Sequence, residues 1–118
     1  FKTEDWRDIK FENLPDYPCV VKGNAGNADY FIIRDKSKVD WQDLRAQCNR
    51  WLNTNYYYAS HEWQYKNIKR CILVEKLLLT KEGKIPNDYK LTFFNGELQF
   101  IYCSIDREGI NKRNIYHF

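Results

Sequence analysis

The pair Asn95-Gly96 is the sequence feature that most restricts how this chain can fold. It separates two segments, 89–94 and 98–103, that are rich in residues favoured in strands. Asn-Gly is the strongest short-range signal for a β-hairpin, because both turn residues must adopt positive φ. The pair therefore predicts an antiparallel hairpin in the C-terminal part of the chain.

Three further apolar runs predict strands. Residues 19–22 indicate a short buried strand, residues 30–34 a second and residues 71–79 a third. The connection 23–29 is rich in Gly, Asn and Asp, which tolerate positive φ. We therefore expect the first two strands to form a hairpin with a flexible tip.

A helix is expected between the second and third of these strands. Asp40 is a favourable N-cap, and Asp43 lies in the first turn, where negative charge is stabilising. Four apolar side chains then share one helical face: Leu44, Cys48, Trp51 and Leu52. The order of elements predicts an α+β fold, in which one main helix packs on an antiparallel sheet.

Length and composition exclude several classes of protein. The 118 residues predict a single domain, 1–118, and 43% hydrophobic with 17% aromatic residues excludes a disordered chain. The net charge is +3 and the basic residues are interspersed with acidic ones, so no nucleic-acid partner is expected. We see no signal peptide, and no apolar run is long enough to span a membrane.

The cysteines and histidines indicate no metal site. The cysteines lie far apart, without the paired spacing of a zinc site, and His61 and His117 lack a set of partner ligands. Disulfides in a secreted protein are one alternative, because the number of cysteines is even. Three of the four lie in apolar patterns, where a free thiol acts as a small buried hydrophobe. We therefore favour a reducing, cytoplasmic compartment. The four are Cys19, Cys48, Cys71 and Cys103.

The stretch 56–65 holds five aromatic residues and has no clear periodicity. Two interpretations are open: the rings belong to the core, or they form a wall that faces a sugar. Aromatic side chains are more often half-buried packing residues. We therefore favour the core.

Lys22 and the loop that follows it are the best candidate for chemistry. Successive backbone N–H groups in such a loop can form an anion-binding concavity, and an adjacent lysine can place a charge on a phosphate. Local features alone favour an ordinary hairpin loop with an exposed lysine. Glu75 lies at the end of an apolar run, and local features alone favour a carboxylate at the point where the strand leaves the core for water.

The order of these motifs resembles a known family. Pro18 to Lys22, the Gly/Asn loop and the segment 30–38 resemble the small-lobe hairpin of ATP-grasp proteins. The segments 51–58, 62–69 and 72–75 look like one branch, the ATP-grasp family named for teichuronopeptide biosynthesis. Further matches continue the resemblance to about residue 114, namely Asp88-Tyr89-Lys90, Phe94-Asn95-Gly96, Phe100-Ile101, Asp106-Arg107 and Lys112-Arg113-Asn114.

The resemblance implies a small lobe at about 16–80 and the start of a large lobe at about 81–118. It implies that Lys22 contacts the α-phosphate or the adenine edge and that the loop closes over the phosphates. It places the adenine edge against the backbone after Glu75, and the ribose or phosphates near the start of the large lobe. The implied ATP-binding residues are Lys22, Asn24, Gly26, Asn27, Glu75, Lys76, Leu77, Asp88 and Lys90.

Two departures from the family pattern limit what this chain is expected to do. The family loop usually has His-Gly-Ser-Gly after the Asn, whereas this one reads Ala25-Gly26-Asn27-Ala28. The acidic and Asn ligands for Mg²⁺ come from later strands of the large lobe, and this sequence ends at Phe118. We expect no metal ligands in this chain and no activity from it alone.

The resemblance implies a parent protein that is an ATP-dependent ligase-like enzyme of bacterial capsule or cell-surface polysaccharide biosynthesis. It would activate a carboxylate as an acyl phosphate, with a saccharide or peptide as acceptor. The alternatives are a non-catalytic binding module with a degenerate lobe, and part of a glycosyltransferase. We also expect self-association through exposed strand edges.

Overall fold

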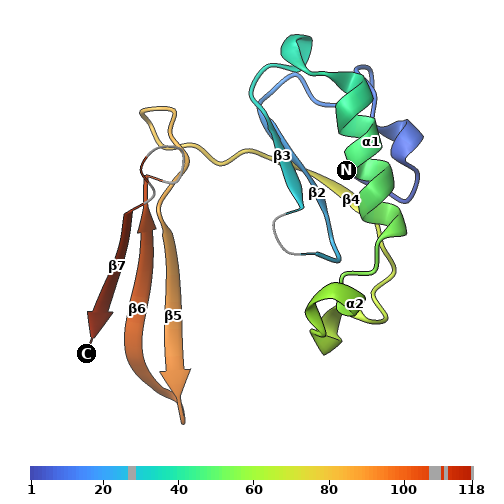
Figure 1. The fold of residues 1–118 in the computed structure, drawn as a ribbon. Helices are drawn as coiled ribbons and strands as arrows, with labels where there is room; N and C mark the ends of the chain where they lie inside the picture. Colours follow the sequence, from blue (N-terminus) through green and yellow to red (C-terminus); the bar gives the residue numbers. More distant parts are fainter. Residues whose placement is uncertain (27–28, 107–109, 111, 118) are drawn as a thin grey trace. The chain divides into compact units, whose positions relative to one another are not determined.

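The computed structural model describes residues 1–26, 29–106, 110 and 112–117, which form two compact units, Phe1–Leu77 and Leu78–Phe118. The first unit has a four-stranded sheet of order β1-β4-β2-β3, and the second a three-stranded sheet of order β5-β6-β7 (Figure 1). The predicted α+β class is confirmed, although the strands form two sheets instead of one. Both edges of β4 are already paired, by β1 and β2, so β5 cannot pair with β4.

The first unit combines antiparallel strands with one long helix and several short ones. Its strands are β1 (Lys2–Thr3), β2 (Cys19–Gly23), β3 (Tyr30–Ile33) and β4 (Ile72–Lys76). Its α-helices are α1 (Trp41–Asn53) and α2 (Tyr57–Ser60), and its 3-10 turns are η1 (Trp6–Asp8), η2 (Lys36–Lys38) and η3 (Trp63–Tyr65). The predicted hairpin, helix and third strand are thus confirmed.

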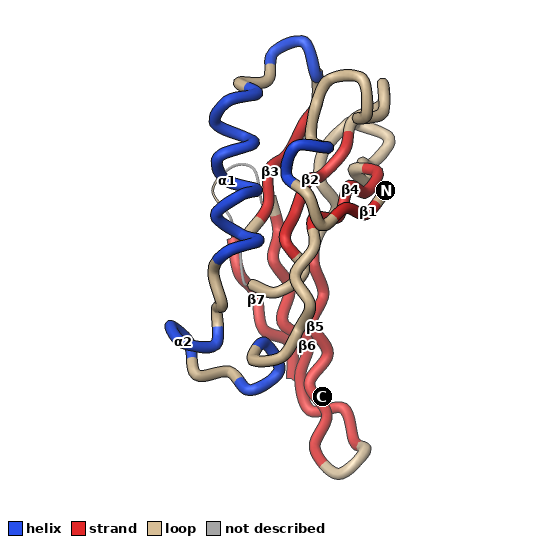
Figure 2. The backbone as a smooth tube through the Cα atoms, turned by 90° about the vertical axis from the view of Figure 1, so that its right-hand side faces the viewer, coloured by secondary structure: helices blue, strands red, loops and turns tan. Residues whose placement is uncertain are grey.

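The core of this unit lies between the sheet and α1 (Figure 2). Alternate residues of each central strand point into it, since side chains of a strand alternate between its two faces. The same core receives two side chains of the N-terminal segment, Ile9 and Leu14. Its other buried members are Cys19, Val21, Ile33, Leu44, Cys48, Trp51, Ile72 and Val74.

The helix α1 begins at the predicted cap. The Asp40 Oδ1 atom accepts hydrogen bonds from the backbone N–H groups of Gln42 and Asp43, both at 3.0 Å. These bonds satisfy two of the N–H groups that a helix start leaves without partners. Below the cap, Leu44 and Cys48 are fully buried, as their helical spacing predicts.

The strand β1 was not predicted, because two residues are too few to show an alternating pattern. It exists through pairing with β4, in the register Lys2↔Leu73 and Thr3↔Ile72. The backbone N–H of Val74 also donates to the Phe1 carbonyl at 2.8 Å. Tertiary pairing therefore fixes this strand, and local sequence does not.

The aromatic stretch 56–65 is not part of the core, so the interpretation that we favoured for it was wrong. None of its residues is buried, and Tyr58 and Trp63 are among the most exposed side chains of the unit. The stretch folds on itself as α2 and η3. Its rings pack on one another and leave ring surface in solvent.

All four cysteines are buried and free, which confirms the prediction of unpaired thiols. Burial in the core raises the pKa of the Cys48 thiol to about 12. A thiol with such a pKa is almost entirely protonated at neutral pH and is a poor nucleophile. The Cys48 side chain therefore acts as a packing group in the core.

The second unit is an antiparallel meander of β5 (Asp88–Phe94), β6 (Glu97–Ile105) and β7 (Lys112–His117). The predicted Asn95-Gly96 turn is confirmed, with φ of 51° at Asn95 and 86° at Gly96. The strand β7 was missed, because all of its residues are exposed and its sequence does not alternate between apolar and polar residues. Its pairing with β6 defines it.

The Asp40 cap provides a test of how α1 begins. We expect Asp40→Ala to lower the free energy of unfolding by about 1 kcal/mol, because two helical N–H groups lose their acceptor. Asp40→Asn keeps an acceptor oxygen and should lose only a fraction of this. Urea unfolding followed by circular dichroism would measure both. Equal losses in the two variants would show that the charge, and not the cap, is what matters.

Candidate site on the sheet face opposite the helix

Lys22 and Glu75 lie on neighbouring strands of the first unit. In the β2–β4 register Val20 faces Glu75 and Lys22 faces Leu73, so Lys22 and Glu75 are diagonal neighbours on one face. The Lys22 Nζ and Glu75 Oε2 atoms form an ion pair at 2.6 Å. The structure thus brings together two predicted site residues that are 53 positions apart in the sequence (75 − 22).

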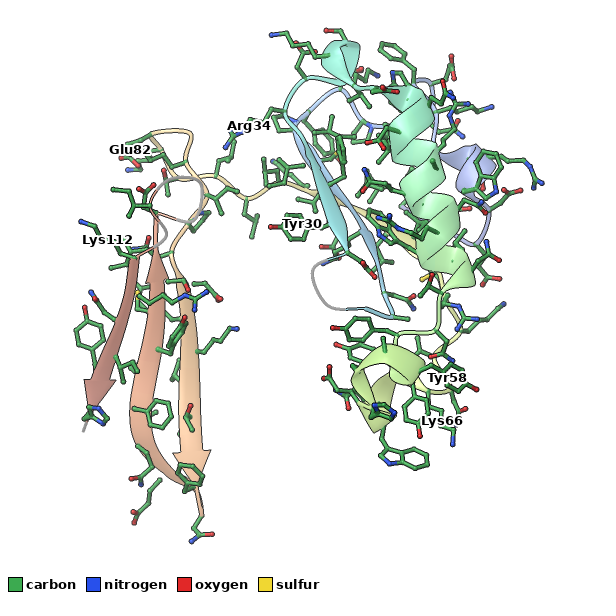
Figure 3. All side chains as sticks on the ribbon, viewed as in Figure 1. Tyr30, Arg34, Tyr58, Lys66, Glu82 and Lys112 are labelled. Atoms are coloured by element: carbon green, nitrogen blue, oxygen red, sulfur yellow. The ribbon has the colours of Figure 1, made fainter. Side chains whose placement is uncertain are left out.

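These two residues belong to the sheet face that points away from α1. Strand alternation places three half-buried aliphatic side chains on the same face, Val20, Ile32 and Leu73. Tyr30 completes the face opposite Lys22 and points away from α1 (Figure 3). We call these six residues the α1-distal face. These six residues combine an apolar surface with one ion pair, and Lys2 of β1, which pairs with Leu73, belongs to the same side of the sheet.

The loop after β2 is fixed to the start of β4 by Asn24. The Asn24 Oδ1 atom accepts from the Cys71 N–H at 2.8 Å, and its Nδ2 donates to the Lys69 carbonyl at 3.0 Å. The Asn24 N–H also donates to the Cys71 carbonyl at 3.1 Å. The Asn24 amide is therefore occupied by backbone partners, and its role in this structure is to position the loop.

Gly26 leaves space for the Asp29 side chain where the loop closes. A Cβ atom at this position would overlap the Asp29 carboxylate. The Gly23 N–H donates to the Asp29 carbonyl at 2.9 Å, so the two ends of the loop meet there. Asn27 and Ala28, which the resemblance places over the phosphates, lie outside the described residues.

Asp29 is a residue of this site that the sequence interpretation overlooked. Burial raises the pKa of its carboxyl, and the positive charge of Arg50 opposes part of that rise. An ionised carboxylate under the loop would repel an approaching phosphate. Its signal in the sequence is the spacing Gly26-x-x-Asp29, in which a residue without a side chain makes room for a carboxylate.

The chain after β4 already uses one of the backbone groups expected to meet adenine. The Leu77 N–H donates to the Pro18 carbonyl at 2.9 Å, and the Leu77 side chain is buried. The Lys76 ammonium lies 5.8 Å from the centre of the Tyr17 ring. A base bound here would have to use other backbone groups of this segment.

Asp88 and Lys90 belong to the second unit and not to the α1-distal face. They occupy alternate positions of β5, where Asp88 pairs with Ser104 and Lys90 with Tyr102. They therefore share one face of the three-stranded sheet. The other described site residues, Lys22, Asn24, Gly26, Glu75, Lys76 and Leu77, all belong to the first unit.

The second unit has a shallow pocket of about 370 Å³ that the sequence did not indicate. Its lining includes the carboxylates Glu82 and Asp106, the cation Lys84 and the apolar side chains Ile85 and Tyr89. Such a mixture favours no single class of ligand. Within the described part of the chain, no three His, Cys, Asp or Glu side chains are grouped as a metal site requires.

The sequence of this chain matches one known family. Residues 2–118 match the family described as TupA-like ATPgrasp. The chain belongs to this family. No significant match exists among curated proteins or solved structures.

The family match covers both units, and it confirms the resemblance found in the hairpin, the loop and the later strands. It supports an ATP-grasp-type protein but assigns no role to any residue. Among the described residues, no helix has the length and apolar character needed to cross a membrane.

The Asp29 carboxyl yields a prediction about stability. Because the pKa of Asp29 is higher in the folded protein, its contribution to the free energy of unfolding is most favourable below the ordinary Asp pKa of about 3.9. This contribution is lost as the pH rises through the pKa of the folded protein. We therefore expect Asp29→Asn to stabilise the protein at neutral pH. The gain should shrink as the pH falls toward about 3.

Thermal unfolding of both proteins across this pH range would measure the difference. A constant gap between the two curves would show that the substitution acts through shape and not through charge. A less stable variant at neutral pH would show that the carboxylate has a favourable partner in the folded state.

Proposed function

We propose that this chain is the nucleotide-binding part of an ATP-grasp ligase-like protein. ATP would lie on the α1-distal face, with its phosphates at Lys22 and the loop 23–29. The observation that carries the proposal is the arrangement of Lys22 on an apolar sheet face, directly before a tight glycine loop. Membership of the TupA-like ATP-grasp family supports the same class of ligand.

Lys22 is suited to exchange its partner. The Lys22 side chain is 37% exposed and that of Glu75 is 52% exposed, so the ion pair is accessible to water. Exposed ion pairs contribute only about 0–1 kcal/mol. A phosphate carries more charge than one carboxylate and would compete well for the ammonium.

The aliphatic part of the face is suited to a flat base. Val20, Ile32 and Leu73 are half-buried; Val20 pairs with Ile32 and is the diagonal neighbour of Leu73. Tyr30 adds an aromatic ring that is 51% exposed. Ligand sites typically combine such apolar walls with a few polar groups that fix orientation. Backbone groups after Glu75 would supply the edge contacts, except the Leu77 N–H.

The reaction that we propose for the parent protein is transfer of the γ-phosphoryl group of ATP to a carboxylate, which forms an acyl phosphate and releases ADP. An amine or similar nucleophile would then attack the acyl carbon and release phosphate. The pathway would be assembly of a capsule or cell-surface polysaccharide, with a saccharide or peptide as acceptor. Mg²⁺ supplies charge neutralisation in phosphoryl transfer. The described residues offer no group of three acidic, His or Cys ligands for it. We therefore assign this chain binding and orientation only.

A non-catalytic binding module is the second candidate. The Asp29 carboxylate under the loop and the occupied Asn24 amide both favour a weaker phosphate site. A module of this type would bind a nucleotide without turnover, even in the parent protein. We found no feature of the described residues that favours a glycosyltransferase.

Calorimetric titration with ATP tests the proposal. We expect Lys22→Ala to weaken binding about tenfold or more, because a charge-assisted contact of about 1.5–3 kcal/mol is lost. Glu75→Gln should strengthen binding, since it releases Lys22 from its ion pair. Lys38→Ala is the matched control, because Lys38 is also an exposed lysine of the first unit with an ion pair, to Asp35 at 3.7 Å.

Two outcomes would contradict the proposal. Failure of the unmodified chain to bind ATP would show that nucleotide binding is not its function. Equal affinities of the Lys22→Ala and Lys38→Ala proteins would leave nucleotide binding possible but would remove it from the α1-distal face. ATP hydrolysis by a longer protein that includes this chain would decide between the ligase and the non-catalytic module.

A further inference from the structure

The segment 55–66 carries exposed aromatic rings that the proposed nucleotide site does not use. Tyr58 is 74% exposed and Trp63 is 69% exposed. Both lie outside the hydrophobic core, and Tyr58 lies at the end of the unit where α1 leads into α2 (Figure 3). We call this segment the aromatic turn. Exposed aromatic side chains that lie together in one patch are a feature of binding surfaces, whereas single exposed ones are common.

The aromatic turn is braced internally, so its rings are held in place without burial. The Tyr56 and Tyr65 rings meet edge to face at 5.2 Å between centroids. The Asn55 Nδ2 donates to the Lys66 carbonyl at 3.0 Å, and its Oδ1 accepts from the Tyr57 N–H at 3.1 Å. A braced surface loses little conformational entropy when it binds a ligand.

Three rings are in contact on this braced segment. The Tyr57 centroid lies 5.4 Å from that of Tyr58 and 5.5 Å from that of Trp63, with interplanar angles of 66° and 47°. The Lys66 ammonium lies 4.1 Å from the Trp63 ring centre and 5.2 Å from that of Tyr57. The chain's own cation thus already fills the place that a cationic ligand would take on these rings.

Polar side chains lie next to these rings in the sequence. The Gln64 Nε2 donates to Glu62 Oε2 at 2.7 Å, which fixes an amide and a carboxylate next to Trp63. The His61 ring lies 6.2 Å from the Tyr57 ring. These groups offer both donors and acceptors to a ligand that lies on the rings.

We propose that the aromatic turn is a binding platform for the pyranose rings of a saccharide, with Trp63 and Tyr58 as the stacking residues. A pyranose has an apolar face of C–H groups, whose partial positive charge suits the negative face of an aromatic ring. Its hydroxyl groups lie at the rim and would pair with Glu62 and Gln64. The platform is separate from the α1-distal face and does not depend on nucleotide binding.

Size and charge exclude the main alternative occupants. Aromatic side chains offer about 150–250 Å² each, so the two exposed rings fall well below the roughly 800 Å² per partner of a stable protein interface. Nucleic acid needs free cations along its backbone. The aromatic turn itself carries a single Lys or Arg residue, Lys66, which lies over the Trp63 ring.

Saturation-transfer NMR and calorimetry with a panel of tetrasaccharides test this platform. The probes are cellotetraose, chitotetraose and tetragalacturonate, so that neutral, N-acetylated and acidic pyranoses are all represented. We expect at least one to bind with millimolar or better affinity. Trp63→Ala should weaken it about tenfold, the effect expected from loss of one stacking contact.

Tyr17→Ala is the matched control, because Tyr17 is also an exposed aromatic residue near a lysine, 53% exposed and 5.8 Å from the Lys76 ammonium. It should bind the saccharide like the unmodified chain, and so should Lys22→Ala. Thermal unfolding would establish that each variant is folded.

Three results would overturn the platform. These are no binding of any probe, equal affinities of the Trp63→Ala and Tyr17→Ala proteins, and binding of AMP in place of saccharide that is lost in Trp63→Ala. Loss of saccharide binding in Lys22→Ala would place the saccharide on the α1-distal face instead. ATP binding measured on the same proteins keeps a failure here distinct from a failure of the nucleotide proposal.

Discussion

The antiparallel pairing of β2 with β4 is the interaction on which the first unit depends. One side of this ladder places Val21 and Val74 against α1, and the other side places Lys22 next to Glu75. A shift of one residue in the register would exchange the two faces and bury the charged pair. The free energy of burying the valines therefore fixes the position of the candidate site.

The loop after β2 shows how the same unit combines stability with a limited capacity for binding. Asn24 ties the loop to the approach to β4, and Gly26 allows it to close over Asp29. These contacts hold the loop close to Lys22, as a phosphate site requires. They also occupy the Asn24 amide and place the Asp29 carboxylate beside the loop. We expect both features to lower the affinity for phosphate.

Local sequence was sufficient for the elements whose signals are local. The Asp40 cap, the helical spacing of Leu44 and Cys48 and the Asn95-Gly96 turn predicted α1 and the β5–β6 hairpin. Local sequence could not predict β1, which exists only through its pairing with β4. The site followed the same rule. The family resemblance identified the site residues, but their grouping depends on the strand register, which only the folded sheet defines. The exposure of the aromatic turn also could not be predicted, because no local pattern shows whether its rings are covered by the rest of the unit.

Chemical-shift mapping by NMR is the most direct test of the central claim, that nucleotide lies on the α1-distal face. Addition of ATP to the isotope-labelled chain should shift the amide signals of Val20, Lys22, Ile32 and Leu73, with smaller changes along α1. Shifts confined to α1 or to the aromatic turn would contradict the account, because Lys22 and Glu75 lie on the side of the sheet that points away from α1.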